Sequence, residues 1–289
     1  MRTLTAPAKV NLALDILGRR ADGYHDMRMV MQTISLCDVV SVEEAEEGFS
    51  LHTGGDFIPA GKKTLEQQAA EAFFEAIAQP MPGLSVTLEK YTPAYAGLGG
   101  GSADVAALLR ILREEYAPQM STETLEQIGF TVGSDMPFCV RGGTALAEGR
   151  GELLTDVPAM PDCWFVLCKP DFGIPTPTLF ALVDGGELEH RPDIDGMITA
   201  LKDHDLDGVA ARLCNVFEEV LPECYHEVFA IIRRLLDLGA LNAAMSGSGP
   251  SVFGIFRQQE TAEQAAAELK KAYAQTYLAE PVKKIGQLE

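Results

Sequence analysis

The segment Gly97-Leu98-Gly99-Gly100-Gly101-Ser102 contains the residue types that hold phosphate groups. Glycine lacks a Cβ, so consecutive glycines let backbone N–H groups converge on an anion and tolerate positive φ. A helix beginning at or just after Ser102 would add unpaired N–H groups and the positive end of its dipole. The Ser102 hydroxyl could cap that helix or turn toward a phosphate or Mg²⁺. The segment therefore predicts an anion site, and a flexible turn is the simpler alternative.

The commoner nucleotide-binding motifs do not describe this loop. A Walker A loop requires G-x-x-x-x-G-K-[ST], which no stretch of the chain satisfies. The dinucleotide fingerprint G-x-G-x-x-G fails at its last position, where Ser102 stands. The VAIK, HRD and DFG segments of protein kinases are also absent from the sequence.

Two isolated charged residues are candidates for chemistry. Lys9 lies inside a predicted strand between Ala8 and Val10, and a lysine in that setting favours a specific partner over solvation. Asp135 lies in a Gly-Ser-Asp-Met-Pro segment, where ordinary capping of a proline-containing helix start explains it equally well. The residues alone leave both interpretations open.

A further candidate follows the turn Asp22-Gly23, which has the residue types of a tight turn. Tyr24 and His25 come next and could present one aromatic face and one imidazole to a ligand. The alternative is that Tyr24 packs against the protein and His25 bonds a backbone group.

Strands and helices must position these residues. In the first half, hydrophobic periodicity predicts a helix over residues 63–79, a second helix after the glycine segment, and strands over 10–17, 28–35, 39–44 and 84–90. In the second half it predicts helices over 177–184, 192–202, 206–215, 222–238 and 261–273, with strands over 163–169, 243–245, 251–256 and 276–284. Pro158 and Pro161 mark a boundary that divides the chain into domains 1–157 and 158–289.

Composition excludes several classes of protein. A formal net charge of −19 argues against nucleic-acid binding, which depends on clustered basic side chains. Residues 1–31 nevertheless carry five basic and three acidic side chains, so a locally positive cleft is expected. No apolar run is long enough to span a membrane, and the first residues do not resemble a signal peptide, which predicts a cytoplasmic protein. The six cysteines show no CxxC pair and are interpreted as small buried side chains.

Three segments together resemble the GHMP kinases, the superfamily that includes galactokinase, homoserine kinase and mevalonate kinase: residues 6–12, 93–102 and 245–253. The resemblance implies an α+β fold with an N-terminal ribosomal-protein-S5-like α/β domain, a C-terminal ferredoxin-like α+β domain and the active site in the cleft between them. It also implies ATP as co-substrate with Mg²⁺. The ATP-binding residues it implies are Pro93, Ala94, Tyr95, Ala96, Gly97, Leu98, Gly99, Gly100, Gly101, Ser102 and Ala103.

Within the superfamily, residues 20–25 and 174–180 resemble the 4-diphosphocytidyl-2-C-methyl-D-erythritol kinases of the non-mevalonate isoprenoid pathway. That resemblance implies that Tyr24 stacks on the cytosine, His25 bonds its edge and Phe180 forms the opposite wall. The substrate-binding residues implied are Asn11, Tyr24, His25, Thr176, Phe180, Gly247 and Ser248. The alternatives are a mevalonate or homoserine kinase and, from another class, a non-catalytic scaffold of the same fold.

The resemblance also assigns the catalytic pair. Asp135 would orient and deprotonate the substrate hydroxyl, and Lys9 would keep Asp135 ionised. Two positions depart from the family pattern: Ala103 replaces a second serine, and Thr64 replaces an asparagine expected on the adenine side. Protein ligands of Mg²⁺ are not assigned. The expected partners are ATP and a cytidine diphosphate-linked polyol, without nucleic acid or membrane, and the expected assembly is a monomer or homodimer.

Overall fold

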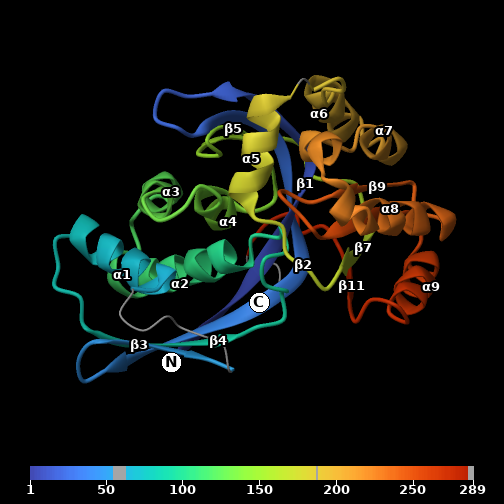
Figure 1. The fold of residues 1–289 in the computed structure, drawn as a ribbon. Coiled ribbons are helices and arrows are strands. Elements are labelled where there is room, and N and C mark those ends of the chain that lie inside the picture. Colours follow the sequence, from blue (N-terminus) through green and yellow to red (C-terminus); the bar gives the residue numbers. More distant parts are fainter. Residues whose placement is uncertain (55–62, 187, 286–289) are drawn as a thin grey trace.

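The computed structural model describes residues 1–54, 63–186 and 188–285, which form two β-sheets with helices packed on them (Figure 1). The first sheet has the strand order β3-β4-β2-β1-β8, and β5 pairs with both β2 and β6. Its strands are β1 (Arg2–Arg19), β2 (His25–Ala45), β3 (Phe49–Thr53), β4 (Gly83–Glu89), β5 (Thr144–Gly149), β6 (Leu153–Asp156) and β8 (Cys214–Asn215). The second sheet has the order β11-β7-β10-β9, with β7 (Trp164–Lys169), β9 (Asn242–Met245), β10 (Val252–Phe256) and β11 (Gln275–Ala279).

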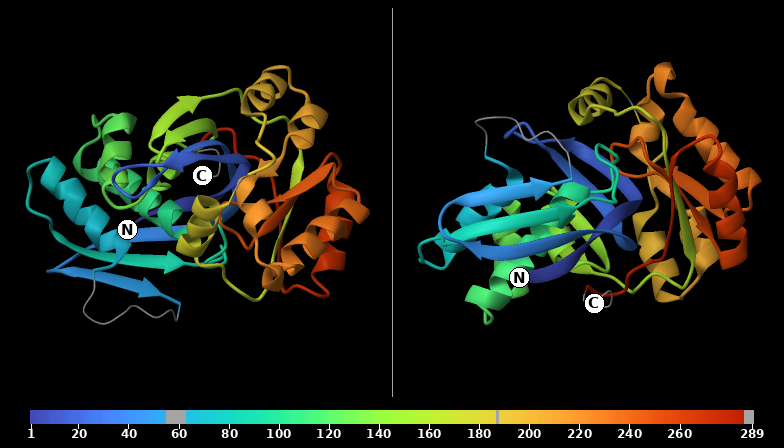
Figure 2. Two further views of the ribbon diagram at one scale, coloured as in Figure 1. Left: turned by 45° about the horizontal axis from the view of Figure 1, so that its top comes forward. Right: turned by 90° about the horizontal axis from the view of Figure 1, so that it is seen from below.

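Helices from the first half pack with the first sheet, and α8 and α9 pack on the second. The helices are α1 (Leu65–Ala76), α2 (Gly100–Tyr116), α3 (Thr122–Phe130), α4 (Met136–Arg141), α5 (Thr176–Gly185), α6 (Ile194–Lys202), α7 (Leu206–Ala211), α8 (Glu227–Asp237) and α9 (Gln259–Leu269). Two short 3₁₀ helices, η1 (Val216–Val220) and η2 (Glu223–Tyr225), follow β8. Figure 2 shows the two sheets in neighbouring halves of the molecule, the first with the blue strands β1 and β2 and the second with the yellow-green strand β7 and the orange-to-red strands β9, β10 and β11. The α+β class is confirmed.

The two halves share buried side chains. Val10 and Leu12 of β1 belong to the same buried cluster as Phe165 of β7 and Phe253 of β10. Burial of these apolar groups removes them from water and holds the sheets together. The predicted boundary between residues 157 and 158 falls between β6 and β7 and stays a prediction.

Several element predictions needed correction. The strands predicted over 28–35 and 39–44 are one continuous strand, β2, whose pairing with β1 absorbs the irregularity as register shifts at Pro7/Lys9, Asn11/Ala13 and Ile16/Gly18. The helix predicted over 206–215 ends at Ala211, and Cys214 and Asn215 instead pair in parallel with β1.

Two more boundaries differ from the prediction. The helix predicted over 222–238 is divided into η2 and α8, and the last strand ends at Ala279 rather than at residue 284. After Ala279 the chain leaves β7 and pairs with β2, where Ser35 N–H donates to Glu280 O at 2.9 Å and Val282 N–H donates to Thr33 O at 2.8 Å. In the part of the chain that the structure describes, no helix combines the length and apolar character needed to cross a membrane.

Candidate active site

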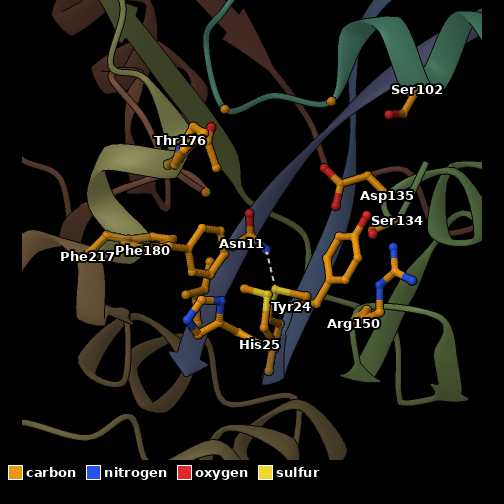
Figure 3. A pocket seen from close by; sticks show the side chains of 18 of the residues that line it. Asn11, Tyr24, His25, Ser102, Ser134, Asp135, Arg150, Thr176, Phe180 and Phe217 are labelled. Carbon is orange, nitrogen blue, oxygen red and sulfur yellow. Dashed lines mark hydrogen bonds between the residues drawn. The ribbon is translucent and has the colours of Figure 1, made fainter. Parts of the chain in front are cut away.

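A cavity of about 720 Å³ opens where β1 and β2, the glycine segment, α5 and the segment after β9 meet (Figure 3). It collects predicted residues from all of these elements. Those that line it are Lys9, Asn11, Tyr24, His25, Gly97, Gly99, Ser102, Asp135, Thr176, Phe180, Gly247 and Ser248. The candidate catalytic and substrate-binding residues, which lie far apart in sequence, therefore share one cavity.

The glycine segment places the start of α2 at this cavity. The helix begins at Gly100, and Gly99 is its N-cap at φ +68°, a conformation that favours glycine. Ser102 is thus inside the first turn and does not cap the helix, so the capping alternative is wrong; its hydroxyl lines the cavity instead. The first-turn N–H groups of a helix have no intrahelical acceptor and favour an anion.

The segment is fixed by backbone contacts on both sides. Lys9 N–H of β1 donates to Leu98 O at 2.9 Å, and the Ser246 hydroxyl donates to Gly97 O at 2.9 Å. Gly97 has φ +74°, and a Cβ added there would lie 2.1 Å from the carbonyl oxygen of Ser246. No side chain fits at Gly97 without moving one of the two glycine-rich segments.

The remaining residues of the segment take different positions. Tyr95 is 89% exposed, whereas Ala96, Leu98 and Ala103 are buried in the core. Their side chains do not face the cavity, so these three would serve ATP only through backbone groups. Since the Ala103 methyl packs in the core, the missing second serine removes no hydroxyl from the cavity lining.

The predicted nucleotide residues outside the cavity lining are Pro93, Ala94, Tyr95, Ala96, Leu98, Gly100, Gly101 and Ala103. At the other departure from the family pattern, the Thr64 hydroxyl accepts a hydrogen bond from Gln67 N–H at 3.2 Å and caps α1. The Thr64 side chain therefore caps α1.

The proposed catalytic pair lies at the centre of the cavity. Lys9 is buried, with 5% of its side chain exposed, and its Nζ lies 3.6 Å from Asp135 Oδ2. The same ammonium donates to Asn11 Oδ1 at 2.8 Å. Asn11 Nδ2 lies 3.4 Å from the sulfur of Met29, the contact drawn as a dashed line in Figure 3. The buried ammonium is thus held between the side-chain oxygens of Asn11 and Asp135.

Asp135 stands at the N-cap position of α4, yet its carboxylate makes no capping hydrogen bond. Its side chain is 39% exposed and lines the cavity. The sequence left open whether this residue only caps a helix, and the geometry rules that out. The carboxylate is available to a ligand.

Aromatic side chains form the other end of the cavity, with Tyr24 and Phe180 on opposite sides of it in Figure 3. His25 stacks on Phe180 with ring centroids 4.4 Å apart and an angle of 18° between the planes. Its Nε2 lies 2.8 Å from Asp184 Oδ1, so that nitrogen carries the proton donated to the carboxylate. Phe217 meets Phe180 edge-on at 5.1 Å.

A hydrogen-bonded link joins α5 to the second glycine segment. The hydroxyls of Thr176 and Ser248 lie 2.7 Å apart. Asn215 Nδ2 donates to the carbonyl oxygens of Met245 and Gly247, each at 2.8 Å. Asn215 of β8 therefore fixes the backbone of residues 245–247, which contacts the glycine segment.

A buried charged group supports the entry to the glycine loop. The Lys90 ammonium pairs with the carboxylates of Asp38 and Asp104, and Asp38 Oδ1 also accepts from the N–H groups of Tyr91 and Thr92 at 2.5 and 2.7 Å. Burial raises the pKa of Asp104 to about 7 against the opposing effect of the Lys90 ammonium. These contacts fix the chain just before the glycine segment.

Sequence reasoning missed several residues that line the cavity, among them Ser134, Arg150 and Asp184. Arg150 occupies the tip of the β5–β6 hairpin between Gly149 and Gly151, whose φ values are +69° and +116°. An arginine between two glycines at a hairpin was a readable signal. No sequence signal pointed to Asp184, because its distance from His25 depends on how α5 packs.

The charges of the cavity fit an anionic ligand. Three cations line it, Lys9, Arg19 and Arg150, against the carboxylates of Asp135 and Asp184. Among the described residues no group of three or more His, Cys, Asp or Glu side chains is arranged to hold a metal ion. The Ser102 hydroxyl and the Asp135 carboxylate are oxygen donors that line the cavity.

Comparison with known proteins agrees with this geometry. The family model for the GHMP kinases N terminal domain matches residues 64–143, and that for the GHMP kinases C terminal region matches residues 197–275. The chain is 42% identical over 280 residues to a 4-diphosphocytidyl-2-C-methyl-D-erythritol kinase from Listeria monocytogenes, covering 96% of both chains. A kinase of the same name from Syntrophomonas wolfei is 38% identical, covering 95% of this chain and 96% of that one.

A solved structure of a 4-(cytidine 5'-diphospho)-2C-methyl-D-erythritol kinase superposes with a TM-score of 0.81 at 32% identity, covering 97% of this chain and 99% of that one. A homoserine kinase from Cytophaga hutchinsonii superposes with a TM-score of 0.74 at 17% identity, which shows a common fold and nothing finer.

Proposed function

The chain belongs to the GHMP kinases and, within them, to the 4-diphosphocytidyl-2-C-methyl-D-erythritol kinases, and from that premise we propose how its cavity performs the reaction. It is an ATP-dependent kinase of a small alcohol in the non-mevalonate route to isoprenoids. The acceptor is the 2-hydroxyl of 4-diphosphocytidyl-2-C-methyl-D-erythritol, and the products are ADP and the corresponding 2-phosphate.

We infer that Asp135 aligns the acceptor hydroxyl and takes its proton. As the hydroxyl oxygen bonds to the γ-phosphorus, the bond from that phosphorus to the β,γ-bridging oxygen breaks and ADP leaves. Lys9, 3.6 Å from the carboxylate, holds Asp135 in place and offsets negative charge that develops nearby. The observation that carries this proposal is the uncapped Asp135 carboxylate beside a buried lysine in the same cavity as the start of α2.

The glycine segment would hold the phosphates of ATP. The first-turn N–H groups of α2 and the Ser102 hydroxyl are the groups available for that task. Mg²⁺ fits this arrangement, because it is usually bound through nucleotide phosphates with one or two protein oxygens rather than by a full protein cage. Ser102 and Asp135 are the residues that would hold it, and the ion would neutralise charge on the phosphates.

The aromatic end would hold the cytosine. Tyr24 and Phe180 supply facing rings, and His25 supplies a nitrogen whose proton state is set by Asp184. Asn11, Thr176, Gly247 and Ser248 lie between the two ends and would position the polyol. A cytoplasmic location and a monomer or homodimer complete the proposal.

An ADP-release assay with the cytidyl alcohol, mevalonate and homoserine side by side tests the substrate. We expect turnover of the cytidyl alcohol and no measurable turnover of the other two, since neither carries a base for Tyr24 and Phe180. Turnover of mevalonate or homoserine without turnover of the cytidyl alcohol would remove the assignment.

A further inference from the structure

Arg150 is the one cation lining the cavity that forms no ion pair with a described residue, and the Asp22 carboxylate acts on it only from beyond ion-pair distance. Lys9 lies beside Asp135, and Arg19 Nη1 lies 3.6 Å from Asp184. The guanidinium of Arg150 has no hydrogen bond to any described residue, and its Nε is buried without a partner. A cation that lines a cavity without an ion pair loses solvation and gains only a distant counter-charge, so the site favours an anionic ligand.

The backbone fixes where this guanidinium lies. The Glu152 carboxylate, which could have paired with the arginine side chain, accepts the backbone N–H of Arg150 at 2.6 Å instead. The hairpin tip packs against the turn before α4, since a Cβ added at Gly151 would lie 3.2 Å from Ser134 O. The position of Arg150 is thereby tied to the position of Asp135, the next residue along that turn.

Two aromatic rings pack against the guanidinium of Arg150. Its central carbon lies 3.5 Å from the centroid of the Tyr24 ring and 4.9 Å from that of Phe130. Stacking uses the faces of a guanidinium and leaves the N–H groups at its edge free to bond a phosphate in a forked geometry. In Figure 3, Arg150 lies on the side of Tyr24 turned away from Phe180 and next to Ser134, so the ring face toward Phe180 stays open.

We propose that Arg150 binds the diphosphate group that joins the base to the acceptor alcohol, and that it does so while supporting the Tyr24 ring from behind. This inference rests on the proposed function, because it takes the base to lie at Tyr24 and the acceptor hydroxyl at Asp135. A ligand spanning those two points carries its diphosphate between them. Arg150 touches Tyr24 and is tied by its hairpin to the turn that carries Asp135.

Calorimetric binding of cytidine and of cytidine diphosphate separates the two contributions. Both ligands carry the base, and only one carries the diphosphate. We expect Arg150→Gln to weaken cytidine diphosphate binding by about 10- to 100-fold, the range of a lost charge-assisted hydrogen bond, and to change cytidine binding by less than about 3-fold. Arg233→Gln, which removes the same charge from an exposed site on α8, is the matched control and should bind both ligands normally.

Arg150→Lys keeps the charge and loses the flat fork, so it should recover part of the diphosphate affinity. Thermal melting of each variant shows whether it is folded. Equal weakening of both ligands would overturn the inference, because it would mean that Arg150 only positions Tyr24, and so would unchanged binding of cytidine diphosphate. If the unmodified protein bound neither cytidine nor cytidine diphosphate, the base site of the proposed function would itself be wrong, an outcome distinct from the other two.

Discussion

The two ends of the cavity are built in different ways. At the proposed phosphate-transfer end, the backbone of the glycine segment is held in place: Leu98 O accepts from Lys9 N–H, Gly97 O accepts from the Ser246 hydroxyl, and Gly97 packs against Ser246 without room for a methyl group. At the recognition end, side chains contact one another: His25 stacks on Phe180 and Arg150 on Tyr24. The first end positions atoms through main chain, and the second recognises a ligand through side chains.

This difference matches what each end must do. Phosphoryl transfer depends on positioning and electrostatics, so small displacements of Lys9 or the glycine segment are costly. Recognition of a base depends on open aromatic faces, and here one face of Phe180 is covered by His25. A base that stacks on Phe180 must use its other face or displace the imidazole. Substitutions at the two ends should therefore affect different kinetic constants.

Asp135→Asn should give the largest effect on catalysis. It keeps the shape of the side chain and removes the proton acceptor, so kcat should fall by about 100- to 10,000-fold. The dissociation constant for ATP should stay within about 3-fold, because the glycine segment is unchanged. Steady-state kinetics and nucleotide binding by calorimetry measure the two quantities. A kcat within 5-fold of the unmodified protein would remove Asp135 from the chemistry.

Gly97→Ala should damage both fold and activity. The added methyl group would meet the Ser246 carbonyl at 2.1 Å and must adopt φ near +74°, so we expect a loss of about 2–4 kcal/mol in the free energy of unfolding. Gly101→Ala is the stability control, since a Cβ there meets nothing within 4 Å. Denaturant unfolding of both variants gives the comparison. Equal stability of the two would show that the contact with Ser246 is not needed.

Tyr24→Ala should act on substrate binding alone. Stacking of a base on an aromatic ring contributes about 1–3 kcal/mol, so the KM for the cytidyl substrate should rise by about 10- to 100-fold. The KM for ATP should change little. Tyr24→Phe keeps the ring and is expected to stay close to the unmodified protein. If both KM values rose together in Tyr24→Ala, the ring would serve the fold of the cavity rather than the base.

Substitution of Glu218 should give the smallest effect, a change in the pH dependence of stability. It tests the hydrogen bond that Glu218 accepts from the backbone at the start of the second glycine-rich segment, residues 245–253. Glu218 accepts the Met245 N–H at 2.7 Å, and burial raises its pKa from the ordinary 4.5 to about 7. The fold therefore favours the neutral acid, and stability falls as pH rises from about 4.5 to 7. Glu218→Gln should not show this fall in the free energy of unfolding, which is on the order of 2 kcal/mol. Thermal melting of both proteins at pH 5 and pH 7.5 measures it, and parallel pH curves would contradict it.

The transfer end was the more predictable from sequence, for a physical reason. Close backbone approach and positive φ demand glycine at positions 97, 99, 247 and 249, so these four glycines report the geometry directly. The start of α2 was misplaced by two residues because Gly99, rather than Ser102, occupies the N-cap position. The alternation of residues 10–17 predicted the position of β1, but it did not predict that the strand extends over Arg2–Arg19.

The recognition end was only partly predictable. Tyr24, His25 and Phe180 were found by resemblance, whereas the stack of His25 on Phe180 and its bond to Asp184 depend on how α5 packs against β2. The glycines on either side of Arg150 indicate a turn in the sequence, but the contact of Arg150 with Tyr24 depends on how the β5–β6 hairpin packs. Side-chain contacts between distant elements leave little trace in local sequence patterns.

The most direct test of the division between the two ends is the ratio of kcat/KM for the full cytidyl substrate to that for the same alcohol phosphate without its cytidyl group. A recognition end that holds the base should make the full substrate better by at least about 100-fold, since stacking and diphosphate contacts are lost together. That preference should shrink in Tyr24→Ala and persist, at reduced rates, in Asp135→Asn. Equal kcat/KM for the two alcohols in the unmodified protein would contradict the assignment of the aromatic end to the base.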